Sequence, residues 1–260
     1  MIRVTFVHHD CFVVELNETI LVFDYIPKDA LMDSEPPVYL HGKMPILPED
    51  KKLFFFVSNG NKDAFSEEIF SYYGKRSDSH FILPKDMGFM TKTKAKYGIH
   101  GLFNHRIHRV GLRQNYEIEG LTIYTLNPNT TGVAYLVEAE GITIYHAGDL
   151  NWTNWGVEQE LYSHLSGSNY KRELKKLQNK HIDLAFVSLD QRLGQAGAKL
   201  GFKYFLEHVP SDLVFPMKLF GHYDLIPYLK EDPEIIRLRD KVIDVDREGI
   251  VFEIPDDRRR

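Results

Sequence analysis

The chain has 260 residues, of which 43% are hydrophobic and 13% aromatic, so it can bury a sizeable core and is not a disordered protein. Its net charge of −5 argues against a nucleic-acid partner, because binding to a phosphate backbone requires clustered Lys and Arg. Cys11 is the only cysteine, which excludes an internal disulfide and suits a reducing compartment.

The first part of the chain has the pattern of short β-strands. Residues 2–7, 11–16 and 19–23 are β-type runs, and Asn17-Glu18 marks a hairpin turn between the second and the third. Residues 53–57 form the longest apolar run, which is far too short to span a bilayer. The first residues lack the apolar stretch of a signal peptide, so we expect a cytoplasmic protein without a membrane partner.

Further strand-like runs fill the middle and the end of the chain. Four of them resemble a meander, with turns at Glu119-Gly120 and Glu140-Gly141, and occupy residues 116–118, 121–126, 132–138 and 142–145. Later runs occupy residues 184–188, 213–215, 242–245 and 250–254. Residues 27–50, which contain many Pro and acidic residues, are expected to form a long surface excursion.

Helical periodicity separates these sets of strands. The expected helices are residues 66–73 with Ile69, Phe70 and Tyr73 on one face, 158–180 with Leu161, Leu165, Leu174 and Leu177 and a potential break at Gly167, and 197–208 with Leu200, Phe205 and Leu206. Two runs of strands with attached helices predict two sheets packed face to face with helices outside. We expect one α/β domain over residues 1–260, ending in a short, solvated charged tail at 256–260.

Three segments place polar residues directly after buried-looking strands, where binding loops usually lie. The first contains Asn59, Asn61, Asp63 and Ala64; the second contains His146, Asp149 and Trp152; the third contains Lys218 and His222.

The second of these segments, with Gly148-Asp149, resembles the metal-bridging motif of the metallo-β-lactamase superfamily. The opening residues 8–15 and 21–25, Asp190 to Gly194 and Pro216-Met217 follow in the order seen in metal-dependent hydrolases related to the ascorbate-6-phosphate lactonases. The resemblance covers residues 1–225. It implies a four-layer αββα sandwich, in which a metal-bound hydroxide hydrolyses a small ester, lactone or phosphate-bearing substrate.

The zinc site that this family implies is largely missing here. Its His-x-His-x-Asp-His motif matches Asn59, Asn61, Asp63 and Ala64, so only the aspartate is kept, and a further family histidine is absent from residues 127–132. The bridging aspartate is kept as Asp149, but Lys218 follows Pro216-Met217 where the last ligand should stand. Because zinc prefers imidazole, thiolate or carboxylate, an amide, an alanine and an ammonium do not form its site.

The surviving charges suggest a different kind of site. Asp63 and Asp149 with Lys218 between them would be compensated without a metal, since the ammonium would stand where the metal stood. Simpler readings exist: Asp63 could cap the next helix, Asp149 could stabilise its turn, and Lys218 could be a surface residue. In that last case His222 could supply an imidazole to one divalent ion held with Asp63 and Asp149.

Several neighbouring residues have both a structural and a functional reading. His146 is expected to be a packed, hydrogen-bonded histidine rather than a ligand, although it could line the pocket. At most one of His8 and His9 should point inward, because adjacent strand residues face opposite ways. Trp152 and Trp155 are expected to pack in the core or to wall the pocket.

Three functions follow from this reading. The first is a non-catalytic, hydrolase-like relative that binds a small-molecule ligand and needs no metal. The second is a weakened hydrolase using one Zn or Mn ion through Asp63, Asp149 and His222. The third is metal-free acid–base chemistry with Lys218, His222 and an aspartate as the catalytic groups.

Overall fold

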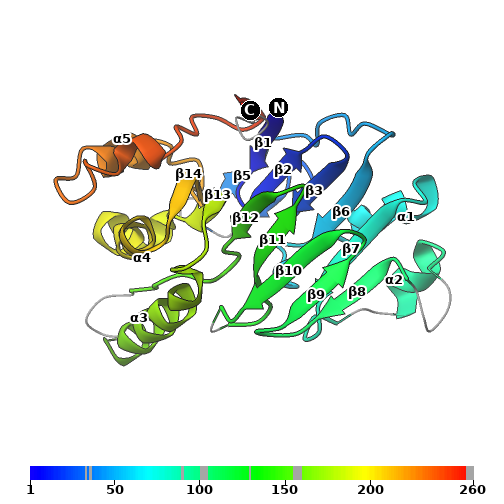
Figure 1. Cartoon of the computed structure of the whole chain (residues 1–260), viewed down its shortest axis with the longest axis horizontal. Coiled ribbons are helices and arrows are strands. Elements are labelled where there is room, and N and C mark those ends of the chain that lie inside the picture. Colours follow the sequence, from blue (N-terminus) through cyan, green and yellow to red (C-terminus); the bar gives the residue numbers. More distant parts are fainter. Residues whose placement is uncertain are drawn as a thin grey trace.

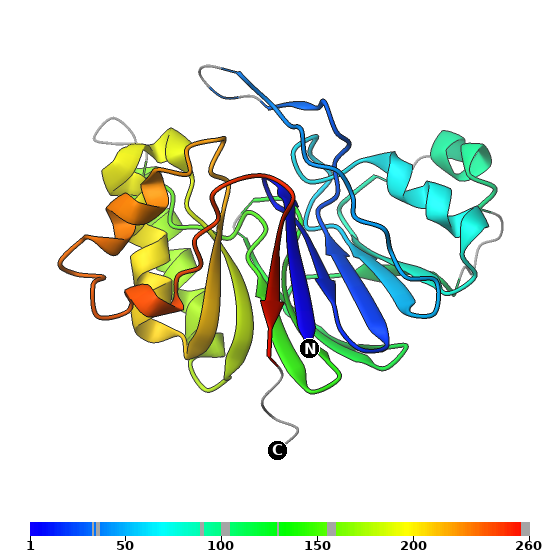
Figure 2. The ribbon, with the colours of Figure 1, turned by 90° about the horizontal axis from the view of Figure 1, so that it is seen from above.

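We describe a computed structural model of the chain over residues 1–32, 34, 37–88, 91–99, 105–128, 130–154 and 160–255. Two β-sheets lie face to face, and Figure 2 shows helices α3 to α5 on one side of them and α1 and α2 on the other. This is the four-layer αββα sandwich that the resemblance implied. The expected charged tail 256–260 lies outside the described residues.

One sheet of the described chain has seven strands (Figure 1). In spatial order they are β15 (Ile250–Ile254), β1 (Ile2–His8), β2 (Cys11–Glu15), β3 (Thr19–Phe23), β6 (Lys52–Phe56), β7 (Ser79–Pro84) and β8 (Ile107–Val110). The turn at Asn17-Glu18 joins β2 to β3 as expected, with Glu15 paired to Ile20. Strands β3, β6, β7 and β8 run parallel to one another.

The other sheet has six strands within the described residues. In spatial order they are β14 (Ser211–Met217), β13 (Ile182–Ser188), β12 (Ile142–His146), β11 (Ala134–Ala139), β10 (Leu121–Leu126) and β9 (Asn115–Ile118). The expected meander is confirmed, and Glu119-Gly120 and Glu140-Gly141 form its turns with positive φ at all four residues. Strands β12, β13 and β14 are parallel, so their carboxyl ends meet at one edge.

The helices and short 3₁₀ turns cover the outer faces of the sheets. On the first sheet lie η1 (Glu67–Phe70), α1 (Ser71–Lys75) and α2 (Thr91–Lys96); on the second lie α3 (Glu160–Leu174), η3 (Lys175–Leu177), η4 (Gln191–Leu193), α4 (Gly194–His208), α5 (Leu225–Lys230) and η5 (Arg239–Lys241). Among the described residues, no helix is both long enough and apolar enough to cross a bilayer.

Strand β6 illustrates why the apolar runs are continuous rather than alternating. Phe54 and Phe56 pack into the core between the two sheets, whereas Leu53 and Phe55 pack beneath the outer helices. Because both faces of the strand are covered, both sets of side chains must be apolar.

Some predicted elements differ from the structure. Residues 242–245 are not a strand: Val242 makes a single bridge to Val214. Strands β7 and β8 were not predicted, because β7 ends in proline and β8 has polar residues at its centre. The excursion 27–50 carries a small two-stranded sheet, β4 (Leu31–Met32) and β5 (Val38–Tyr39).

The predicted apolar face of the 158–180 helix is only partly buried: Leu174 and Leu177 are buried as expected, and the two leucines of the first turns are not. Leu161 and Leu165 are 69% and 54% exposed, whereas Tyr170 and Leu174 are buried. The helix is not broken at Gly167. A side chain there would stand 2.5 Å from Nε1 of Trp152, so the glycine allows the indole to pack directly on the helix.

Candidate functional site

Four loops meet at the edge of the sandwich where the parallel strands end. Asp10 lies in the turn between β1 and β2, Asn59 follows β6, Asp149 follows β12, and Lys218 follows β14. Three of these four residues belong to the segments that the sequence singled out. We refer to Asp10, Asp149 and Lys218 as the lysine cluster.

Lys218 lies between two carboxylates. Its Nζ is 2.8 Å from Oδ2 of Asp10 and 2.8 Å from Oδ1 of Asp149, and its side chain is only 5% exposed. Burial alone would lower the pKa of Lys218, but the charges of Asp10, Asp149 and Asp63 outweigh it and hold the pKa well above its usual value. The residue is therefore an ammonium and not a free amine.

The two carboxylates differ in their surroundings. Asp10 is completely buried, and burial raises its pKa despite the neighbouring Lys218. Asp149 is 21% exposed; burial would raise its pKa, but the charge and hydrogen bond of Lys218 bring it below the usual value. Asp149 also accepts a 3.2 Å hydrogen bond from Nδ2 of Asn59 through its other oxygen. Both oxygens of Asp149 are therefore engaged.

The loop after β6 presents Asn59 to the cluster. Asn59 is 1% exposed, and its Oδ1 accepts the backbone N–H of Asn61 at 2.8 Å. Ser58 anchors the loop, donating its backbone N–H and its hydroxyl to Asp24, both at 2.6 Å. Asn61 itself is exposed, so its side chain does not share the buried position of Asn59.

Of the two partners that the sequence suggested for Lys218, Asp149 forms an ion pair with it, but Asp63 does not. Its place in the ion pair is taken by Asp10, while Asp63 acts on Lys218 only through its charge. Its Oδ1 is buried and has no hydrogen-bond partner among the described residues. Asp63 does not cap the next helix either, because Ser66 is the N-cap of η1.

His146 is a packed histidine, as its structural reading expected. Its ring stacks on Phe23 with centroids 4.9 Å apart. Nδ1 accepts the N–H of Gly148 at 3.2 Å, which leaves Nε2 to donate to the carbonyl of Asp10 at 3.1 Å. Burial lowers the pKa of His146 to about 4, so the imidazole is neutral and holds the turn that carries Asp10.

His8 and His9 are both buried, but their side chains meet different surroundings. His9 lies near the charges of Lys218 and Asp63. Strand β1 ends at His8, and His9 has a φ of 49°, so the alternation of strand side chains does not extend to it. His8 contacts the carbonyl of Ile26 through Nε2 at 2.9 Å, whereas neither ring nitrogen of His9 has a hydrogen-bond partner among the described residues.

His222 and Trp152 lie away from the lysine cluster. His222 is 41% exposed and its Nδ1 lies 4.0 Å from Asp224. Trp152 packs on Gly167 of α3, with the ammonium of Lys171 4.2 Å from the centre of its ring. The structure therefore supports the packing role for Trp152, and Trp155 lies outside the described residues.

Three of the eight side-chain-bearing residues with positive φ in the described chain lie around Lys218. His9, Lys218 and Phe220 have φ of 49°, 62° and 49°, which side-chain-bearing residues rarely adopt. They contact one another, because the N–H of Lys218 donates to the carbonyl of His9 at 3.4 Å and the rings of His9 and Phe220 are 4.6 Å apart. Surrounding packing must hold such conformations in place.

The donors at this edge do not fit the zinc centre that the resemblance implies. At the matching positions stand the amide of Asn59, the exposed Asn61, the methyl group of Ala64 and the ammonium of Lys218. The ammonium already lies in ion-pair contact with Asp10 and Asp149, the carboxylates a metal would need. Asp63, Asp149 and His222 do not form a group of converging ligand atoms in the described chain.

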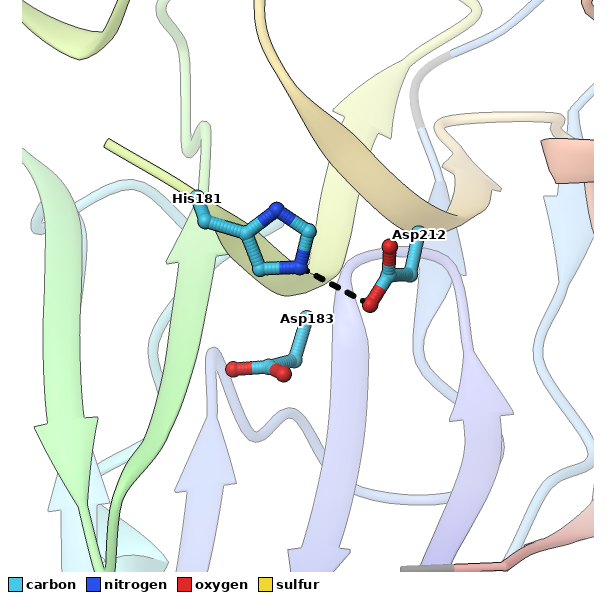
Figure 3. A group of neighbouring side chains, drawn as sticks. All are labelled: His181, Asp183 and Asp212. Atoms are coloured by element: carbon cyan, nitrogen blue, oxygen red, sulfur yellow. Dashed lines mark hydrogen bonds and ion pairs between the residues drawn. The ribbon is translucent and has the colours of Figure 1, made fainter. Parts of the chain in front are cut away.

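A different trio brings three ligand-type atoms together. His181, Asp183 and Asp212 have atoms within 4.8 Å of one another (Figure 3). They lie at the beginnings of β13 and β14, the opposite edge from Lys218. His181 and Asp212 are exposed and form a 3.0 Å contact, and Asp183 accepts the N–H of Thr143 at 2.7 Å. These contacts within the protein account for the closeness of the three side chains without a metal ion.

Two hollows of the molecule also lie away from the lysine cluster. A groove of about 650 Å³ is lined by residues that include Lys230, Asp244 and Phe252. A smaller hollow of about 250 Å³ lies on the outer face of the second sheet, over Tyr124 and Leu136.

Comparison with known proteins extends these observations. No family model matches the sequence, and no curated protein matches it. A possible metal-dependent hydrolase from Veillonella parvula DSM 2008 is similar in structure, with a TM-score of 0.61 at 12% identity over 98% of this chain and 100% of that one. Isothiocyanate hydrolase from Delia radicum gut bacteria gives 0.55 at 15% identity, over 97% and 99%.

A third similar structure is the metallo-β-lactamase fold protein YhfI from Bacillus subtilis, with a TM-score of 0.53 at 11% identity over 97% of this chain and 100% of that one. Together with the αββα layers, these likenesses show that the chain has the metallo-β-lactamase fold.

Asp10 is the member of the lysine cluster that sequence reasoning missed as a site residue. It follows directly after a buried strand, as the polar residues of the three chosen segments do. The position of Asp10 after a buried strand therefore indicates a site residue in the same way, although the β1–β2 hairpin was taken only as evidence for the fold.

Proposed function

We propose that this chain is a non-catalytic relative of the metallo-β-lactamase-fold hydrolases, in which the ammonium of Lys218 takes the place of the metal. The observation that carries the proposal is the pair of 2.8 Å contacts from Lys218 to Asp10 and Asp149 in a buried site. A charged ammonium has no lone pair to offer a metal and repels a cation placed beside it. We also propose that the protein is cytoplasmic and that it is related to the ascorbate-6-phosphate lactonase-like branch of these hydrolases.

The strained backbone supports a maintained site rather than a decayed one. Left-handed conformations of side-chain-bearing residues cost roughly 1–2 kcal/mol each. His9, Lys218 and Phe220 all carry this cost in one place. A site without a purpose would gain stability by relaxing, so we take the strain as support for a retained function.

We propose that this function is the binding of a small polar molecule. Asp63 offers a carboxylate oxygen without a hydrogen-bond partner in the described chain. The charge of Arg192, whose guanidinium pairs with Asp190, is near enough to act on it. Hydrolysis through Lys218 as a base is disfavoured, because an ammonium with a raised pKa has no free electron pair at neutral pH.

Metal analysis tests the proposal. Protein purified without chelator is analysed for zinc and manganese, and crystals are examined for anomalous scattering between Asp10 and Asp149. We expect no metal there, and we expect no turnover of lactones or phosphate esters with or without added manganese. A metal between these two carboxylates would overturn the proposal in favour of the weakened hydrolase.

The variant Lys218→His serves as the positive control for this experiment. It removes the ammonium and supplies an imidazole beside Asp10 and Asp149, which is a ligand set that divalent ions accept. We expect manganese to raise the melting temperature of this variant and to leave that of the wild type unchanged. An equal shift in both proteins would mean that the ion binds elsewhere.

A further inference from the structure

Two histidines on neighbouring strands hold their ring nitrogens close together. His80 comes from β7 and His108 from β8, and these strands pair in parallel with Ile82 opposite His108. Side chains alternate along a strand, so His80 and Ile82 face the same side, and His80 becomes the diagonal neighbour of His108. Nδ1 of His80 lies 3.3 Å from Nε2 of His108.

The pair is held in place on one side and accessible on the other. The ring of His80 stacks on Phe54, with centroids 5.2 Å apart and planes at 22°, and the residue is only 6% exposed. His108 is partly exposed, so solvent reaches the pair from its side. The two imidazoles lie near the beginnings of β7 and β8, whereas Asn59 follows the end of the adjacent parallel strand β6. The pair is thus separate from the lysine cluster.

Both imidazoles are neutral at neutral pH. Burial lowers the pKa of His108 to about 4, with a further contribution from His80. Burial also lowers the pKa of His80. Of the surrounding charges on His80, Glu119 raises its pKa and Arg106, Lys52 and His105 lower it. Neutral imidazole is the form that coordinates metal ions.

We propose that His80 and His108 form a two-histidine site for a late first-row divalent ion such as Zn²⁺, Ni²⁺ or Cu²⁺. Two nitrogens bound to one tetrahedral zinc at about 2.0–2.1 Å stand roughly 3.3 Å apart, the separation found here. Imidazole suits these three ions, and water completes the coordination. Without an ion, the same separation allows an N–H to N hydrogen bond between the rings.

Titration of the purified protein with Ni²⁺ and Cu²⁺, followed by calorimetry, tests the site. We expect one equivalent to bind, and His108→Gln to weaken binding more than about tenfold, because it removes one of two ligands. The matched control is His181→Gln, which alters an exposed member of the trio in Figure 3 and should leave this binding unchanged. Wild-type protein that binds no ion, or His108→Gln binding as tightly as wild type, overturns the proposal.

A second measurement keeps the test decisive if His108→Gln folds poorly. The electron paramagnetic resonance spectrum of Cu²⁺ on the wild-type protein should show coupling to two imidazole nitrogens, and coupling to only one contradicts the pair. The inference is independent of the proposed function. If bound zinc is lost in the His108→Gln variant, the zinc belongs to the histidine pair. If zinc remains bound in that variant and gives anomalous scattering between Asp10 and Asp149, it belongs to the lysine cluster.

Discussion

The ammonium nitrogen of Lys218 lies 2.8 Å from Oδ2 of Asp10, joining the end of β14 to the first hairpin of the chain. The contact connects the edges of the two sheets at the site, because Asp10 lies in a turn between two strands of the seven-stranded sheet and Lys218 follows a strand of the other. In this position the lysine acts as an internal counter-ion to the carboxylates around it.

Replacing Lys218 by alanine should lower the free energy of unfolding by about 3 kcal/mol at pH 8, in the range for breaking a buried ion pair. The wild type holds the pKa of Asp149 below its usual value, so this carboxylate stays ionised at both pH 8 and pH 5. In the variant, two buried carboxylates face each other without a counter-ion, so one of them can take up a proton at pH 5 and relieve the repulsion. The difference between the two proteins should therefore narrow at pH 5. Denaturant unfolding at both pH values measures it.

The matched control for this experiment is Lys62→Ala, since Lys62 is exposed on the loop after β6. It should change the free energy of unfolding by less than about 0.5 kcal/mol. Equal effects of the two substitutions, or a Lys218→Ala effect that does not depend on pH, would contradict the counter-ion role.

Asp10→Asn and Asp63→Asn distinguish the partner that the structure assigns from the one that the sequence suggested. Asp10 is completely buried and in contact with Lys218, so its replacement should cost about 2 kcal/mol, less than loss of the lysine because Asp149 remains. Asp63→Asn should lower the free energy of unfolding by less than about 1 kcal/mol, because Asp63 acts on Lys218 only through its charge. Chemical denaturation at pH 7 compares the two, and the reverse order would restore Asp63 as the partner.

His146→Gln should make the protein less sensitive to acid. Burial lowers the pKa of His146 to about 4 in the folded protein, against about 6.5 when unfolded. Unfolding therefore takes up a proton in this window, and stability falls as the pH drops from about 6.5 towards 4. The variant should take up about one proton fewer on unfolding at pH 5. An unchanged slope of unfolding free energy against pH would show that His146 does not titrate this way.

Gly132→Ala should be more damaging than Gly120→Ala. Both glycines have positive φ, at 85° and 95°, but a Cβ at Gly132 would stand 2.0 Å from the carbonyl oxygen of Ser58, whereas none of the described atoms lies within 4 Å at Gly120. We expect Gly120→Ala to lower the free energy of unfolding by about 1 kcal/mol, because of backbone strain. Gly132→Ala should lower it by about 3 kcal/mol, because steric overlap of the new Cβ adds to the strain. Thermal melts compare them, and similar losses would mean that the loop holding Asn59 moves aside freely.

The sequence by itself determined the architecture of this protein. Strand-like runs such as residues 19–23 and 121–126 were found with their observed bounds, since β-type residues bounded by turn signals leave few alternatives. Order and spacing of the segments around Asn59, Asp149 and Lys218 placed all three at one edge, because parallel strands end together.

Only the tertiary structure decided which carboxylates face Lys218. Asp10 and Asp63 both follow buried strands, and sequence spacing does not determine which loop turns its side chain inward. The ion pair of Lys218 with Asp10 is accompanied by left-handed backbone at His9 and Lys218. Local sequence does not predict this conformation, because packing against Phe220 must outweigh its cost. Likewise, His80 and His108 become neighbours only through the pairing of β7 with β8, a long-range contact to which neither short strand gives a local signal.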